Sequence, residues 1–203
     1  PAELTTPFDP YPGGLSRGGL QDEIVTVMSV PHEMTIPRRL AGRYLKIELL
    51  GISGSFDFVF DKLTFKTQTS VTNEAPALAS TTDPLVRDIY KVGLNTLKEC
   101  MQTVYEDGPK RDRRLWIGDL YLEALANAHT FKNHELTKHC LYLLAAFAND
   151  EGLLHATLLE KPQPHPQYGT HTLDYCLIYN VALLEYLKET GDRETANDLW
   201  PVV

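Results

Sequence analysis

Residues 107–119, which read D-G-P-K-R-D-R-R-L-W-I-G-D, constrain the fold of this chain more than any other stretch. Gly108 is conformationally loose and Pro109 lacks a backbone N–H donor, so a preceding helix has to end at this point. Gly118 and Asp119 are typical of the start of a second helix, with the aspartate at the N-cap or in the first turn. The acidic residues of the stretch are therefore predicted to lie on a loop between two helices, where catalytic side chains often converge.

The second half of the chain is predicted to be helical. Asp83 and Pro84 mark a helix start, because an acidic N-cap is followed by proline at the first helical position. Apolar side chains at helical spacing predict further helices at 119–131, 134–149, 172–190 and from about 193 onward. The helix at 119–131 is apolar on most sides, which is typical of an inner helix and predicts that it is more buried than its neighbours. The long connection at 150–171 is expected to be functional or mobile.

The N-terminal part is predicted to be a β-rich module between two irregular segments. Residues 1–20 are rich in proline and glycine and are predicted to be irregular. The β-branched run at 24–30 and the period-two alternation at 43–50 predict strands within a β-rich module over 21–70. The small polar residues of 71–83 are typical of a linker.

Charge and cysteine content narrow the class of protein. The formal net charge of −8 argues against nucleic acid or an anionic membrane surface as a partner. No apolar run reaches the roughly 18 residues that a membrane-spanning helix needs. Cys100, Cys140 and Cys176 lack C-x-x-C spacing and are predicted to be buried free thiols. Free thiols and the lack of a signal-peptide pattern slightly favour the cytoplasm, although the compartment stays open.

No metal ion or other cofactor is predicted. His129, His134 and His139 are spaced so that each is rotated by about 140° from the last, and they do not share a helix face as metal ligands would. The sequence also contains no Gly-rich phosphate loop and no G-x-S-x-G nucleophile motif.

One spacing pattern in the 107–119 stretch is specific to a family, and it consists of Asp107, Pro109, Arg111, Asp112, Trp116, Gly118 and Asp119. It resembles the active-site signature of the α-L-rhamnosidase glycoside hydrolases. In that signature a D-x-P-x-R-[ED] run is followed by Trp and Gly-Asp at the same offsets. The resemblance extends from about residue 40 to the C-terminus.

The resemblance implies a mixed fold, in which a β-sandwich-like module precedes an (α/α)6 barrel built of helical hairpins. The helices predicted over 84–203 make up about half of such a barrel. The rest of the barrel would come from residues missing from this sequence or from another chain. Taken alone, the chain is therefore expected to be an incomplete catalytic domain.

The resemblance also implies a reaction. Hydrolysis of a glycosidic bond uses two carboxyl groups, one to protonate the leaving oxygen and one to activate water or attack carbon. The family inverts and removes terminal α-L-rhamnose from glycosides or polysaccharides. It places the general acid at Asp112, where glutamate is more frequent, so the acid here has a shorter reach. Asp107 and Asp119 fall on positions that bind sugar hydroxyls, and Arg111 is expected to hold Asp107 or the sugar. No residue of this chain maps onto the general base.

Several alternatives remain open at this point. Trp116 is either a stacking platform for the sugar or a buried core residue. Asp174 either lines the sugar site or only caps its helix and interacts with the helix dipole. The charged residues around Asp112 could form a solvated turn with internal ion pairs. The chain could also belong to a glycosidase of other sugar specificity, or be a carbohydrate-binding or interaction module without catalysis.

Overall fold

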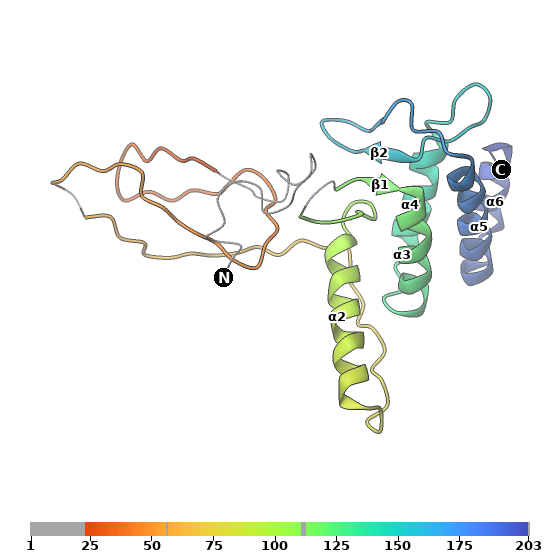
Figure 1. Cartoon of the computed structure of the whole chain (residues 1–203), viewed down its shortest axis with the longest axis horizontal. Coiled ribbons are helices and arrows are strands. Elements are labelled where there is room, and N and C mark those ends of the chain that lie inside the picture. Colours follow the sequence, from red (N-terminus) through yellow and green to blue (C-terminus); the bar gives the residue numbers. More distant parts are fainter. Residues whose placement is uncertain (1–22, 56, 111–112, 203) are drawn as a thin grey trace. The chain divides into compact units, whose positions relative to one another are not determined.

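The computed structural model describes residues 23–55, 57–110 and 113–202 (Figure 1). The chain divides into two compact units, Pro1–Thr67 and Gln68–Val203. The predicted irregular segment at 1–20 lies outside the described residues.

The first unit forms neither helices nor strands in its described residues, 23–55 and 57–67. The strands predicted at 24–30 and 43–50 are therefore wrong for this structure. A period-two pattern forms a strand only where a partner strand completes the hydrogen-bond ladder and one face is buried. Among the described residues of this unit, no strand pairs with residues 43–50. The apolar side chains of the alternation also stay exposed, with Ile47 at 49% and Leu49 at 53%.

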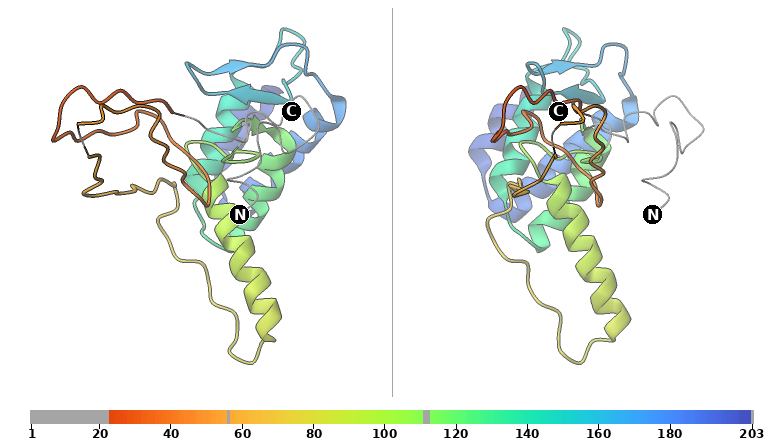
Figure 2. Two further views of the ribbon diagram at one scale, coloured as in Figure 1. Left: turned by 60° about the vertical axis from the view of Figure 1, so that its left-hand side comes forward. Right: turned by 90° about the vertical axis from the view of Figure 1, so that its left-hand side faces the viewer.

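The second unit is mainly helical, with one small sheet. Its elements are α2 (Pro84–Cys100), β1 (Leu115–Trp116), α3 (Ile117–His129), α4 (His134–Ala145), β2 (Thr157–Leu159), β3 (His165–Pro166), α5 (Leu173–Thr190), α6 (Arg193–Leu199) and a 3-10 turn (Trp200–Val202). The small sheet has the order β1-β2-β3, with antiparallel pairing throughout. Figures 1 and 2 show that it lies across one end of α3, α4 and α5.

The helix boundaries follow from local capping. The Asp83 carboxylate accepts a hydrogen bond from the backbone N–H of Leu85 at 2.8 Å, so α2 begins where the sequence predicts. Asn133 caps α4 in the same way through the N–H of Leu136. Gly191 ends α5 with a left-handed φ of 70°, which a residue with a Cβ rarely adopts. The predicted helices are present with shifted bounds, because α2 already ends at Cys100, before Gly108 and Pro109, α3 begins at Ile117 rather than at residue 119, and α4 ends at Ala145 rather than at 149.

The core of the second unit lies between α3, α4, α5 and the segment that follows α2. Its fully buried members include Met101, Tyr105, Leu120, Leu141 and Tyr179. The prediction that α3 is the most buried helix is wrong within this chain, because α4 buries five side chains and α3 buries four. Leu122 of α3 is 66% exposed, so one face of this apolar helix has no cover from the described residues.

A buried polar network fixes the chain just before the 107–119 stretch. The Asn127 side-chain amide donates hydrogen bonds to the Tyr105 hydroxyl at 2.8 Å and to the backbone carbonyl of Asn133 at 3.0 Å. The Tyr105 hydroxyl also lies 2.8 Å from the hydroxyl of Thr137. All three side chains are buried, so their polar groups need these partners. The network ties Tyr105 to both α3 and α4, and thereby positions the residues that follow it.

The three cysteines are free, as predicted; Cys100 and Cys140 are buried and Cys176 is half-buried. Among the residues that the structure describes, no helix has the length and apolar character to cross a membrane. The same residues contain no group of three or more histidine, cysteine, aspartate or glutamate side chains placed to hold a metal ion.

Candidate active site

The loop after α2 is closed at its base by Asp107 and Arg114. The backbone N–H of Asp107 donates to the carbonyl of Arg114 at 3.1 Å, and the Asp107 carboxylate accepts from the N–H of Arg114 at 3.1 Å. Asp107 therefore shapes the loop with one of its oxygens. The predicted acid Asp112 and its neighbour Arg111 lie outside the described residues. The hydrogen bonds between Asp107 and Arg114 hold the start and the end of the loop side by side.

The exit of the loop is anchored on the 150–171 connection. Leu115 and Trp116 form β1 and pair with Leu158 and Thr157 of β2. The Arg114 guanidinium donates a 2.7 Å hydrogen bond to the Gln167 side-chain carbonyl. The connection is thus partly ordered into β2 and β3 rather than irregular, and its ordered part holds the loop in place.

Trp116 packs against the first turn of α5. Its ring meets the ring of Tyr175 edge to face, with a centroid distance of 6.4 Å and an interplanar angle of 90°. Trp116 is half-buried, so it is not a fully buried core residue. The geometry leaves part of the indole accessible beside the loop, which is compatible with sugar stacking.

Gly118 leaves room for the close approach of the Tyr175 side chain. A Cβ at this position would lie 2.9 Å from the Tyr175 hydroxyl oxygen and 3.0 Å from the ring carbon that carries it. Contacts this short force a neighbour to shift. The glycine of the Gly118-Asp119 pair is therefore explained by packing between α3 and α5, next to Trp116.

We expect Gly118→Ala to destabilise the protein by about 1–3 kcal/mol, because the added methyl group overpacks the contact with Tyr175. The control is Gly93→Ala in α2, where an added Cβ meets no atom within 4 Å. That change is expected to stabilise the helix by roughly 0.5–1 kcal/mol, since alanine suits a helix interior better than glycine. Urea unfolding of both variants measures the difference. Equal stability of the two variants would contradict the packing role of Gly118.

Asp119 lies in the first turn of α3, half-buried, and burial raises the pKa of its carboxyl group. One helical turn later lies Glu123, whose pKa is raised to about 8 by burial and then by the negative charge of Asp119. Asp107 and Glu106 raise the pKa of Glu123 further. The charges of Asp107 and Asp119 therefore both raise the pKa of Glu123, whereas a common binding site for these carboxylates stays a prediction.

Two acidic residues of this cluster are absent from the sequence-based prediction. Glu106 is only 4% exposed although it carries a carboxylate, and its backbone N–H donates to the carbonyl of Cys100 at 2.9 Å. Glu123 is half-buried in an otherwise apolar stretch of α3. Glu123 could have been found from the sequence, because it follows Asp119 by four residues and this spacing places both on one helix face. Glu106 had no comparable signal.

Comparison with known proteins places the chain in a family. A model of the glycosyl hydrolase family 78 alpha-rhamnosidase N-terminal domain matches residues 1–67. A model of the bacterial alpha-L-rhamnosidase six-hairpin glycosidase domain matches residues 75–203. The chain belongs to the bacterial α-L-rhamnosidases. This confirms the resemblance inferred from the 107–119 signature.

Two solved structures are similar to this rhamnosidase family member. A rhamnosidase from Klebsiella oxytoca with rhamnose bound is 41% identical, with a TM-score of 0.91 over 99% of this chain and 39% of its own. A GH78 family rhamnosidase of Bacillus sp. GL1 is 24% identical, with a TM-score of 0.57 over 65% of this chain and 13% of its own, and supports the fold alone. The chain thus spans 39% of the length of the Klebsiella protein. No curated protein sequence matches the chain.

Asp174 lies in the first turn of α5, where it is exposed. It is therefore in a position to interact favourably with the helix dipole. Burial raises the pKa of the neighbouring Tyr175 hydroxyl most, and the charges of Asp119, which belongs to the signature, and of Asp174 raise it further.

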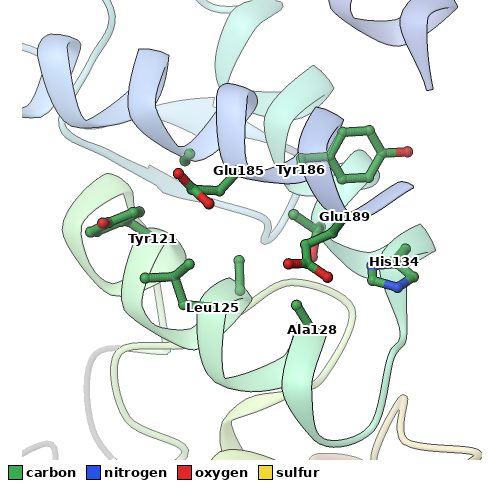
Figure 3. A pocket seen from close by; sticks show the side chains of 10 residues that line it. Tyr121, Leu125, Ala128, His134, Glu185, Tyr186 and Glu189 are labelled. Carbon is green, nitrogen blue, oxygen red and sulfur yellow. The ribbon is translucent and has the colours of Figure 1, made fainter. Parts of the chain in front are cut away.

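A pocket between α3, α4 and α5 is separate from this site. Residues of all three helices line it, and Figure 3 shows Tyr121, Leu125 and Ala128 of α3 facing Glu185 and Glu189 of α5. At about 100° per residue, these α3 positions lie on the side of the helix away from Asp119 and Glu123. The pocket contains none of the predicted site residues, so it is not the candidate active site.

Proposed function

We propose that this chain supplies the acid side of the active site of an inverting glycoside hydrolase. The enzyme removes terminal α-L-rhamnose from glycosides or polysaccharides. The observation that carries the proposal is the complete seven-residue signature, in a member of the α-L-rhamnosidase family. The rhamnose bound to the Klebsiella relative supports a rhamnose-containing substrate.

Asp112 is the general acid in this proposal. A general acid must hold its proton near neutral pH, and burial and neighbouring carboxylates favour that. Asp107 and Asp119 flank Asp112 in the signature and act on Glu123, so the loop lies beside a site of concentrated negative charge. This setting supports the assignment of the acid to the loop.

The other signature residues bind the sugar. Asp119 and Asp107 accept hydrogen bonds from sugar hydroxyl groups, and Arg111 holds Asp107 or the sugar. Trp116 stacks on the apolar face of the pyranose, which its half-buried position beside Tyr175 supports. Asp174 lines the outer edge of the site. No metal ion or other cofactor has a role in the proposed reaction.

The complete enzyme combines a β-sandwich with an (α/α)6 barrel. Exposed apolar side chains along two helices support the barrel. They are Leu85, Ile89 and Val92 on α2, and Leu173, Leu177 and Val181 on α5, all at helical spacing and each more than 40% exposed. Such stripes are typical of helices that pack against further helices. The general base and the covering hairpins come from residues outside this sequence or from another chain.

Initial rates on aryl glycosides test the function. The full-length protein is expected to hydrolyse aryl α-L-rhamnosides with a higher kcat/KM than the matching α-L-fucoside, α-L-arabinoside or β-D-glucoside. Faster hydrolysis of one of the other glycosides would favour a barrel glycosidase of different sugar specificity. Binding of rhamnose with no hydrolysis of any glycoside would favour a carbohydrate-binding module.

A further inference from the structure

The carboxyl group of Glu123 occupies an unusual place beside the candidate site. It lies one turn after Asp119 on the same face of α3, because the two residues are four positions apart. Its oxygen Oε2 is buried and has no hydrogen-bond partner among the described residues. A buried carboxylate without a partner is costly, whereas a protonated carboxyl group is tolerated far better.

The groups that interact with Glu123 come from α2, α3, α4 and the loop after α2, and they are acids, thiols or hydroxyls. The Cys100 thiol at the end of α2 is a neighbour that lowers the pKa of Glu123, against the larger effects of burial and of the Asp119 charge. Groups that interact with Glu123 electrostatically lie on the loop after α2, on α3 and on α4, and they are Tyr105, Glu106, Asp107, Asp119 and Cys140. On α5, Tyr175 interacts with Asp119. An ionised Glu123 would therefore add its negative charge to the negative charges of the neighbouring carboxylates.

Glu123 and Asp119 differ in how strongly their surroundings favour the proton. Burial and the charge of Asp119 raise the pKa of Glu123 to about 8. Burial raises the pKa of Asp119 as well, but an interaction with its own backbone opposes the shift. When two coupled carboxyl groups have unequal surroundings, one keeps the proton and the other ionises.

We propose that Glu123 is a positioning residue of the site, which holds the single proton of the Asp119–Glu123 pair and thereby keeps Asp119 ionised. This inference rests on the proposed function, in which Asp119 accepts hydrogen bonds from sugar hydroxyl groups. An ionised carboxylate is acceptor-only and binds hydroxyl groups more strongly than a neutral carboxyl group. Loss of the Glu123 proton at alkaline pH puts a second charge beside Asp119 and disturbs the site.

The pH dependence of kcat/KM tests the proposal in the full-length protein. Wild type is expected to lose activity at alkaline pH for two reasons, because the general acid loses its proton and because Glu123 ionises as pH rises through about 8. In Glu123→Gln only the first loss remains, so the alkaline limb moves to higher pH and falls less steeply, and the variant keeps more activity than Glu123→Ala. The matched control is Glu99→Gln, an exposed glutamate of α2, which leaves the limb in place. An unmoved limb in Glu123→Gln, or a loss as large as in Glu123→Ala, would overturn the proposal.

Thermal unfolding gives a second reading that does not need activity. The raised pKa of Glu123 contributes stability that is fully present below its ordinary pKa of 4.5 and is lost as pH rises through about 8. The Tm of wild type is therefore expected to fall relative to that of Glu123→Gln across this range. Parallel Tm curves would mean that Glu123 is ionised throughout. If wild type hydrolyses no rhamnoside, the proposed function fails, and the Tm curves still decide where the proton lies.

Discussion

Replacing Asp112 with asparagine in the full-length protein is expected to lower kcat/KM for phenyl α-L-rhamnoside by roughly 10²–10⁴-fold. Phenolate is a poor leaving group, so its departure depends on a proton from the general acid. Asparagine has nearly the same shape as aspartate but carries no such proton. Initial rates near the pH optimum measure the change, and calorimetric titration with rhamnose checks that the sugar still binds.

The matched control for this prediction is Asp88→Asn, which removes the same charge from an exposed position of α2. It is expected to leave both rate and affinity close to those of wild type, as most surface substitutions do. Undiminished activity of Asp112→Asn would remove Asp112 from the role of acid. The loop would then be explained as a solvated turn whose charges pair internally.

The second large effect is the low activity that we expect of the isolated chain. The 203-residue chain is expected to hydrolyse aryl α-L-rhamnosides at least roughly 10²–10⁴-fold more slowly than the full-length protein, because no residue in it maps onto the general base. An inverting enzyme needs its base about 6.5–9.5 Å from the acid, across the sugar. The exposed apolar stripes of α2 and α5 are also expected to make the isolated chain associate, which light scattering measures.

Circular dichroism is the necessary control, since an unfolded chain would be inactive for a trivial reason. If the isolated chain is helical and turns over the rhamnoside as fast as the full-length protein, both carboxylates are already present. Asp107, Asp119 or Asp174 would then have to be the base. Asp107 is the least suited of the three, because one of its oxygens already accepts a hydrogen bond from the backbone of Arg114.

The helical part was predictable because its signals are local. Asp83 and Pro84 mark the start of α2, and Gly191 marks the end of α5, through interactions within a few residues. The sheet of β1, β2 and β3 was not predictable, because strands of two or three residues are too short to show a period. The alternation at 43–50 is a clear local pattern, but it led to a wrong prediction because no partner strand is present in the described residues.

The candidate site was predictable only in part, because some of its signals are local and others depend on contacts between distant residues. The turn chemistry of residues 107–119 indicates a loop between helices, and the signature indicates which residues matter. The role of Glu123 depends on Cys100 and Glu106, which are distant in sequence and meet it only through the packing of α2 on α3. The requirement for Gly118 likewise depends on Tyr175, more than fifty residues away. Such contacts leave no local pattern.

The central claim is that the 107–119 loop supplies the proton for the leaving group, and leaving-group dependence tests it most directly. Phenyl and dinitrophenyl α-L-rhamnosides are compared with wild type and with Asp112→Asn, at the same pH. Dinitrophenolate leaves without a proton, so Asp112→Asn is predicted to lose most of its kcat/KM on the phenyl substrate and little on the dinitrophenyl substrate. Equal losses on both substrates, or no loss on either, would contradict the claim.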